Sequence, residues 1–163
     1  METIFLITSF APGPVWLLLF FAPRLRLTTV AADVLIFGLA ALYAAMVLPE
    51  LPALIPIIAS PELESIRALL ATERGVVPGW VHWIIADLWI GRWICFDCLR
   101  LGVPHIVRVP LLLATLFFGP LGLLSYLIVR AIRLRAAPVP FYSIGQKAYE
   151  AQSSASGVGS TPH

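Results

Sequence analysis

Hydrophobic residues in this chain are gathered into four long blocks separated by short polar segments. The blocks lie at residues 4–21, 30–48, 79–99 and 107–129. Each is close to the roughly 20 residues that a helix needs to cross the hydrocarbon core of a bilayer. The pattern therefore predicts an all-α, polytopic membrane protein whose four transmembrane helices form one domain, residues 1–135.

Prolines and glycines mark interruptions within two of these blocks. Pro12 and Pro14 each remove a backbone donor, so the first helix is expected to be kinked or to begin near Pro14. The Gly-Pro-Leu-Gly sequence that begins at Gly119 predicts a kink or a close helix contact at mid-depth in the fourth block. Neither interruption changes the number of predicted spans.

Residues 49–78 form the one substantial loop between predicted spans. The prolines from Pro49 to Pro61 are expected to prevent a continuous helix through the first part of this loop. Its second part separates apolar from charged residues, which predicts a short interfacial amphipathic helix at about residues 61–74. A plain surface connector is the alternative. Residues 136–163 are rich in Pro, Ser and Gly and predict a flexible tail.

The composition of the whole chain agrees with a lipid environment. Hydrophobic residues make up 60% of the 163 residues and charged residues only 12%, against about 25% in an average soluble domain. The net charge of +2, without a long basic run, argues against a nucleic-acid partner. We expect a multi-pass integral membrane protein, with the lipid bilayer as its partner and its oligomeric state left open.

Basic residues in the connecting segments give an expectation for orientation. With four spans, one face of the membrane receives Arg24, Arg26, Arg100 and Arg108, and the other receives Arg67, Arg74, Arg130, Arg133, Arg135 and Lys147. Cytoplasmic segments carry the excess of basic residues. The larger group, and with it both termini, is therefore expected in the cytoplasm.

The third block carries ionisable side chains that are costly to place in a bilayer. His82, Asp87, Arg92 and Asp97 recur at intervals of five residues, so neighbours in the series differ by about 140° around a helix. Side chains that meet on one helix are three or four residues apart. Partners for these groups must therefore come from other helices, from lipid head groups or from a ligand, and Arg92 is expected to pair with a carboxylate.

The predicted topology brings further polar residues to the leaflet that holds the C-terminal end of this block. They belong to the start of the second span and to the two short links: Arg24, Arg26, Asp33, His105 and Arg108. Four tryptophans of the third block add aromatic side chains: Trp80, Trp83, Trp89 and Trp93. A polar pocket with tryptophan walls is the functional interpretation, and contacts that only hold the helices together are the alternative.

The chain contains no motif for a bound cofactor or metal. A G-x-G-x-x-G after a strand and a G-x-S-x-G are both missing, so nucleotide cofactors and a hydrolase nucleophile have no support. Three histidines are too few for a membrane di-iron site. Cys95 and Cys98 have the thioredoxin spacing without a βαβ context, which leaves packing, a redox pair or a metal site with His105 as interpretations. We expect acid–base chemistry or binding, with no cofactor and no metal.

These residues together resemble the neoxanthin synthase family of plants and its bacterial relatives, the abscisic-acid-deficient-four-like proteins. Within residues 5–135 the resemblance rests on Pro23, Tyr43, Trp80, His82, Asp87, Gly91, Arg92, Asp97, Gly102, Pro104, His105, Gly119, Pro120, Gly122 and Tyr126. The fold implied by the resemblance is a single four-helix membrane domain. The family's bacterial members imply a location in a bacterial inner membrane.

The resemblance also implies an activity in carotenoid biosynthesis, the conversion of violaxanthin to neoxanthin. In that isomerisation an epoxide opens to an alcohol while a nearby proton leaves and an allene forms. The step needs an acid at the epoxide oxygen and a base at the carbon-bound proton. On this hypothesis Asp87 or His82 is the base, a protonated Asp97 or His105 is the acid, and Arg92 anchors a carboxylate or the developing alkoxide.

Aromatic side chains would lie along the polyene of such a substrate. The residues expected to bind it are Tyr43, Trp80, Trp83, Trp89, Trp93 and Tyr126. The expected substrate is an oxygenated carotenoid or a related isoprenoid lipid. Two functions stay open at this point, an intramolecular isomerase of the neoxanthin synthase type and a non-catalytic membrane protein that binds pigment or stabilises a partner complex.

Overall fold

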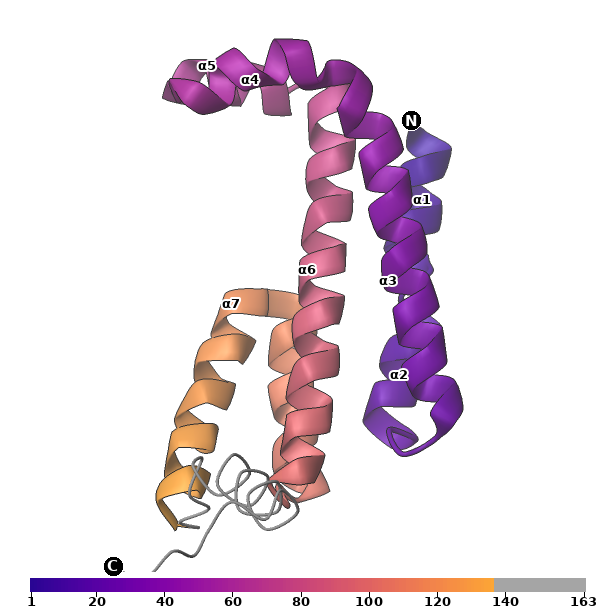
Figure 1. The fold of residues 1–163 in the computed structure, drawn as a ribbon, viewed down its shortest axis with the longest axis vertical. Coiled ribbons are helices and arrows are strands. Elements are labelled where there is room, and N and C mark those ends of the chain that lie inside the picture. Colours follow the sequence, from indigo (N-terminus) through magenta and orange to yellow (C-terminus); the bar gives the residue numbers. More distant parts are fainter. Residues whose placement is uncertain (137–163) are drawn as a thin grey trace, which may run out of the picture. The chain divides into compact units, whose positions relative to one another are not determined.

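The computed structural model describes residues 1–136, and this part of the chain consists of helices and short links without any strand (Figure 1). In chain order the helices are α1 (Glu2–Phe10), α2 (Gly13–Phe21), α3 (Arg26–Val47), the 3-10 helix η1 (Leu48–Glu50), α4 (Leu51–Ala59), α5 (Leu63–Leu70), α6 (Glu73–Arg100) and α7 (His105–Ala136). Met1–Leu127 form one compact unit, and the described residues after Leu127 belong to a second one. The predicted tail lies outside the described residues except for Ala136.

The first hydrophobic block folds as two successive helices, α1 and α2. The break falls at Ala11 and Pro12, and Pro14 occupies the first turn of α2, where a missing backbone donor breaks no helical hydrogen bond. The predicted interruption at these prolines is confirmed.

The loop after α3 is more helical than its prolines suggested. Residues 48–50 form η1 and residues 51–59 form α4, with Pro56 inside it. The α-helix is not continuous, since η1 separates α3 from α4 and α4 ends before Pro61. The segment is nevertheless helical, because Pro49 and Pro52 lie in first turns, where proline is tolerated. The amphipathic helix α5 is present but ends at Leu70, and neither α4 nor α5 has a buried residue.

The long helix α6 is the element around which the other helices of this unit are packed. Its N-terminus is capped by Thr72, whose hydroxyl oxygen accepts a hydrogen bond from the amide of Gly75 at 3.1 Å. From there α6 contacts α1, α2, α3 and α5. Gly91 is essential to the approach of α2, because a Cβ atom at this position would overlap the ring of Trp16. The buried core lies along this contact and includes Trp16, Leu19, Leu88, Ile94 and Cys95.

α7 consists of two helical arms joined by a sharp reversal. The backbone leaves the helical region at Phe118 (φ −140°, ψ 37°) and Gly119 (φ 1°, ψ −72°). Gly122 of the second arm lies so close to the backbone of Thr115 in the first arm that a Cβ atom would overlap it. In a straight helix these two residues would be about 10 Å apart along the axis. The predicted kink is therefore confirmed, and it is strong enough to make a hairpin (Figure 1).

Three helical stretches among the described residues have the length and apolar composition of a membrane span. They are Glu2–Phe21, Arg26–Ala59 and His105–Arg135. The predicted span at residues 79–99 lies within α6, which is long enough but carries ionisable side chains along its length. The finding supports a helical membrane protein and leaves the number of four spans as a prediction.

Candidate functional site

α6 distributes its ionisable side chains between two neighbouring helices. His82 and Arg92 contact α3, whereas Asp87 and Asp97 contact α7. Residues five apart on a helix differ by about 140° and residues ten apart by about 80°. Alternate members of the series therefore face the same neighbouring helix.

Arg92 joins α6 to α3 through an ion pair. Its Nη2 lies 2.8 Å from Oδ1 and 3.0 Å from Oδ2 of Asp33, and its guanidinium carbon lies 5.4 Å from the ring centre of Phe96. The expectation that Arg92 pairs with a carboxylate is confirmed. Because the pair satisfies both charges, it accounts for the presence of Arg92 without a ligand.

Asp97 belongs to a buried polar cluster where α6 meets the second arm of α7. The side chain is 5% exposed and accepts hydrogen bonds from the hydroxyl group of Tyr126 and from Nη2 of Arg100. Trp93 packs edge-on against Tyr126, with ring centres 5.1 Å apart. These contacts fix the second arm of the hairpin against α6.

Asp87 is partly buried beside the turn of the α7 hairpin. Its carboxylate occupies the place that a side chain at Gly119 would take. Only glycine leaves this space free, so the carboxylate of Asp87 can pack directly against the helix break at Gly119.

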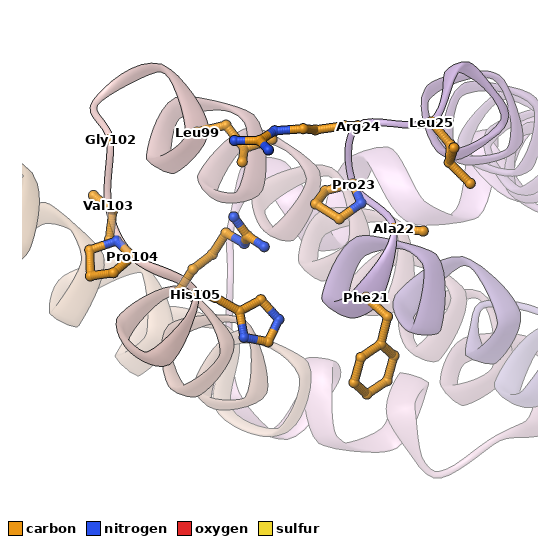
Figure 2. A pocket seen from close by; sticks show the side chains of 11 residues that line it. Phe21, Ala22, Pro23, Arg24, Leu25, Leu99, Gly102, Val103, Pro104 and His105 are labelled. Atoms are coloured by element: carbon orange, nitrogen blue, oxygen red, sulfur yellow. The ribbon is translucent and has the colours of Figure 1, made fainter.

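His105 begins α7 and lies beside the end of α2. Its Nε2 lies 3.0 Å from the carbonyl oxygen of Phe20. A carbonyl oxygen can only accept, so Nε2 carries the hydrogen. Figure 2 shows this ring on one side of a cavity, with Phe21 and Pro23 on the other.

His82 lies in a second cavity, near the N-terminal end of α6. The cavity has a volume of about 450 Å³ and is lined by Tyr43, Leu70, Val76, Gly79, Trp80, His82 and Trp83. The rings of Tyr43 and His82 are tilted by 47° with centres 5.7 Å apart. Two groups able to exchange protons thus face an otherwise apolar, aromatic space, a combination typical of small-molecule sites.

Trp80 is held in place at this cavity by α1. Its Nε1 donates a hydrogen bond of 2.9 Å to the hydroxyl of Ser9, and its ring lies 5.6 Å from that of Phe5. A further cavity of about 430 Å³ shares Tyr43, Leu70 and Gly79 with the His82 cavity and continues beside α4. The space available to an elongated apolar molecule therefore extends beyond the His82 cavity itself.

An aromatic stripe continues along α6 from His82. Trp89 and Trp93 lie within about 20° of His82 around the helix, roughly 10 and 16 Å further along its axis. Trp89 is 58% exposed. The stripe runs between the side of α6 that contacts α3 and the side that contacts α7.

The structure brings the predicted site residues together in two separate groups. One group consists of Tyr43, Trp80, His82 and Trp83, and the other of Trp93, Asp97 and Tyr126. Along α6, Asp97 lies about 22 Å from His82. Asp87, Trp89, Arg92 and His105 belong to neither group, so the five ionisable residues do not share one cavity.

Ser9 and Arg108 were not among the residues predicted to be catalytic or to bind substrate. Ser9 binds Trp80, and no feature of its sequence neighbourhood indicates this contact. Arg108 is only 6% exposed. The sequence signal for Arg108 is its position between apolar residues, where an arginine is unexpected unless it has a partner.

Both cysteines of α6 are buried free thiols. Cys95 Sγ lies 3.4 Å from the carbonyl oxygen of Leu19, and Cys98 is fully buried. Within residues 1–136, no group of three histidine, cysteine or acidic side chains is placed to hold a metal ion. The contact of Cys95 with Leu19 belongs to the packing of α6 against α2.

Comparison with known proteins gives one clear result. The family model described as ABA DEFICIENT 4-like matches residues 3–126, which include every helix up to the second arm of α7. No curated protein matches the chain. No solved structure matches it either.

Proposed function

The chain belongs to the ABA DEFICIENT 4-like family, and from that premise we propose that it is a membrane isomerase of the neoxanthin synthase type. Its substrate would be an oxygenated carotenoid or a related isoprenoid lipid, and no cofactor takes part. The observation that carries the proposal is the pair of Tyr43 and His82 in an aromatic cavity at the side of α6.

The proposed reaction uses Tyr43 as the acid and His82 as the base. Tyr43 donates its proton to the epoxide oxygen as the carbon–oxygen bond breaks. His82 removes a proton from a nearby carbon, and the electrons of that C–H bond form the new double bond of the allene. Proton return from His82 to Tyr43 restores both groups, so no oxidant is needed and the step is a net isomerisation.

Asp97 and His105 are less suitable as the acid in this arrangement. One substrate ring cannot reach both His82 and a group about 22 Å away along α6. Asp97 already accepts hydrogen bonds from Tyr126 and Arg100, and His105 is bonded to the backbone of α2. We therefore assign these two residues to the assembly of the helices rather than to proton transfer.

The test is expression in a bacterium that accumulates epoxidised carotenoid, followed by chromatography of the pigments. The native chain should produce an isomer of the epoxide of equal mass. His82→Ala and Tyr43→Phe should each lower its formation about 100-fold or more, the usual contribution of acid–base groups. Arg67→Gln, at an exposed residue of α5, is the matched control. Product formation that survives both substitutions at equal protein level would contradict the assignment.

Pigment binding without catalysis is the second candidate. Trp83 and Trp89 are 66% and 58% exposed, so they can stack on a polyene from the lipid side. On this alternative the pigments of the host stay unchanged, carotenoid copurifies with the protein, and Trp89→Ala lowers the amount bound while His82→Ala does not.

A further inference from the structure

A cavity lies where the two short links of the helical unit meet. The links are residues 22–25, between α2 and α3, and residues 101–104, between α6 and α7. The cavity has a volume of about 650 Å³. Three of its lining side chains are basic, Arg24, His105 and Arg108, and none of its lining residues is acidic. In Figure 2, Arg24 lies above and His105 below the space between the links.

Arg108 lines this cavity without a counter-charge. The side chain is 6% exposed, and its buried Nε has no hydrogen-bond partner. Among residues 1–136 no carboxylate lies within ion-pair distance of it. Arg92 also has a buried Nε without a hydrogen-bond partner, but its charge is paired with Asp33. Arg100 is paired with Asp97, so the missing counter-charge is what distinguishes Arg108. A buried and unpaired guanidinium is strongly destabilising, so an anion from outside the chain is the group that would complete this site.

The first turn of α7 adds to the preference for an anion. His105 begins this helix and faces the cavity. The amide hydrogens of Val107 and Arg108 are bound by the carbonyl oxygen of Pro104, so the helix contributes through its partial charge rather than through these donors. A helix N-terminus carries a partial positive charge that attracts phosphate and carboxylate groups. The remaining wall is apolar, with Phe21, Leu99 and Val103 beside the charged groups.

We propose that this cavity binds a phosphate group, with Arg108 as its buried ligand and Arg24 as its ligand at the rim. Guanidinium groups bind phosphate oxygens in a planar, two-hydrogen-bond arrangement. The mixed wall fits the phosphodiester of an anionic phospholipid, with its acyl chains against Phe21 and Leu99. A free phosphate ester would use the same basic groups. This site is independent of the proposed isomerase activity, because it shares no residue with the His82 cavity.

The test measures thermal stabilisation of the full chain in a neutral detergent after lipid has been removed. The probes are phosphatidylglycerol, phosphatidylcholine and inorganic phosphate, each added to the native chain and to Arg24→Gln, Arg108→Gln and Arg26→Gln. Arg26 is the matched control, an exposed arginine at the start of α3 that does not line the cavity. The native chain and the control should be stabilised by phosphatidylglycerol more than by phosphatidylcholine.

Arg24→Gln should weaken the apparent affinity for phosphatidylglycerol about tenfold, the effect of losing one charge-assisted contact, and Arg108→Gln should abolish the stabilisation. Stabilisation by inorganic phosphate alone would support the site and assign it to the free anion. If Arg108→Gln fails to fold, Arg24→Gln decides the matter because its side chain is exposed. Equal affinity in Arg24→Gln and in the Arg26→Gln control would overturn the proposal.

Discussion

Two glycines show how much one missing side chain decides in this helical unit. At Gly91 of α6 the ring of Trp16 from α2 fills the space of a Cβ atom, whereas nothing lies within 4 Å of that space at Gly38 of α3. Both residues are in helix interiors. The same substitution should therefore have opposite consequences at the two positions.

Gly91→Ala should destabilise the protein by about 1–3 kcal/mol, the usual cost of overpacking a core. Gly38→Ala should leave the stability unchanged or raise it by up to about 1 kcal/mol, because alanine loses less conformational entropy in a helix. Unfolding by sodium dodecyl sulfate in mixed micelles measures both free energies. Equal losses in the two variants would show that Trp16 does not lie against α6 in this way.

At the scale of elements, the hairpin of α7 is the feature that departs most from the predicted fold. Its first arm leads away from the short links and its second arm returns toward them, since Gly119 lies beside Asp87 and Tyr126 beside Asp97. The apolar pattern of the sequence does not distinguish two arms of half length from one long span, because both contain the same apolar residues. The difference lies in the backbone at Phe118 and Gly119, where the helix is broken.

The hairpin predicts a short distance between spin labels at Ile106→Cys and Leu127→Cys, both exposed positions. A straight helix would separate these residues by about 31 Å, whereas the hairpin should bring the labels within about 20 Å of each other. Cys95 and Cys98 would be replaced by alanine, and pulsed electron spin resonance would measure the distance. Labels at Trp80→Cys and Arg100→Cys on the uninterrupted α6 are the control and should give about 30 Å.

Local signals in the sequence predicted the helix breaks, and tertiary contacts decided the rest. Pro12 and Gly119 act through their own backbone, so their effects could be predicted. The five-residue spacing of α6 predicted partners on other helices, and Arg92 has one in Asp33. Asp97 has one in Tyr126 but also pairs with Arg100, three residues further along α6 itself, so for Asp97 the expectation was only partly right. Spacing does not fix how α6 is rotated against α3 and α7, however. It therefore could not show that His82 and Asp97 belong to different contacts.

At the scale of the whole helical unit, charge is distributed unevenly between its two ends. Within Met1–Leu127, the end with the short links carries four arginines, Arg24, Arg26, Arg100 and Arg108, and the opposite end carries two, Arg67 and Arg74. A straight fourth crossing would have assigned the arginines after residue 128 to the opposite end. Because α7 turns back, the arginines after residue 128 can no longer be assigned to the opposite end.

The short links are accordingly expected on the cytoplasmic side, the reverse of the orientation that four straight spans predict. The test is cysteine labelling in intact bacterial cells with a membrane-impermeant maleimide, again without Cys95 and Cys98. Ser60→Cys should react in intact cells, and Leu25→Cys only after permeabilisation. The opposite pattern would restore the orientation expected from four straight crossings.

The turn of α7 at Asp87 also has a consequence for the surrounding bilayer. Trp83, beyond that depth, and Trp89, just short of it along α6, are 66% and 58% exposed, so acyl chains or a guest molecule must fill the space beside them. Flexible acyl chains lose conformational freedom against an aromatic wall, whereas a rigid conjugated rod has little to lose. The length and unsaturation of the host's fatty acids therefore set the competition for this space, and the host's growth temperature becomes a determinant of occupancy.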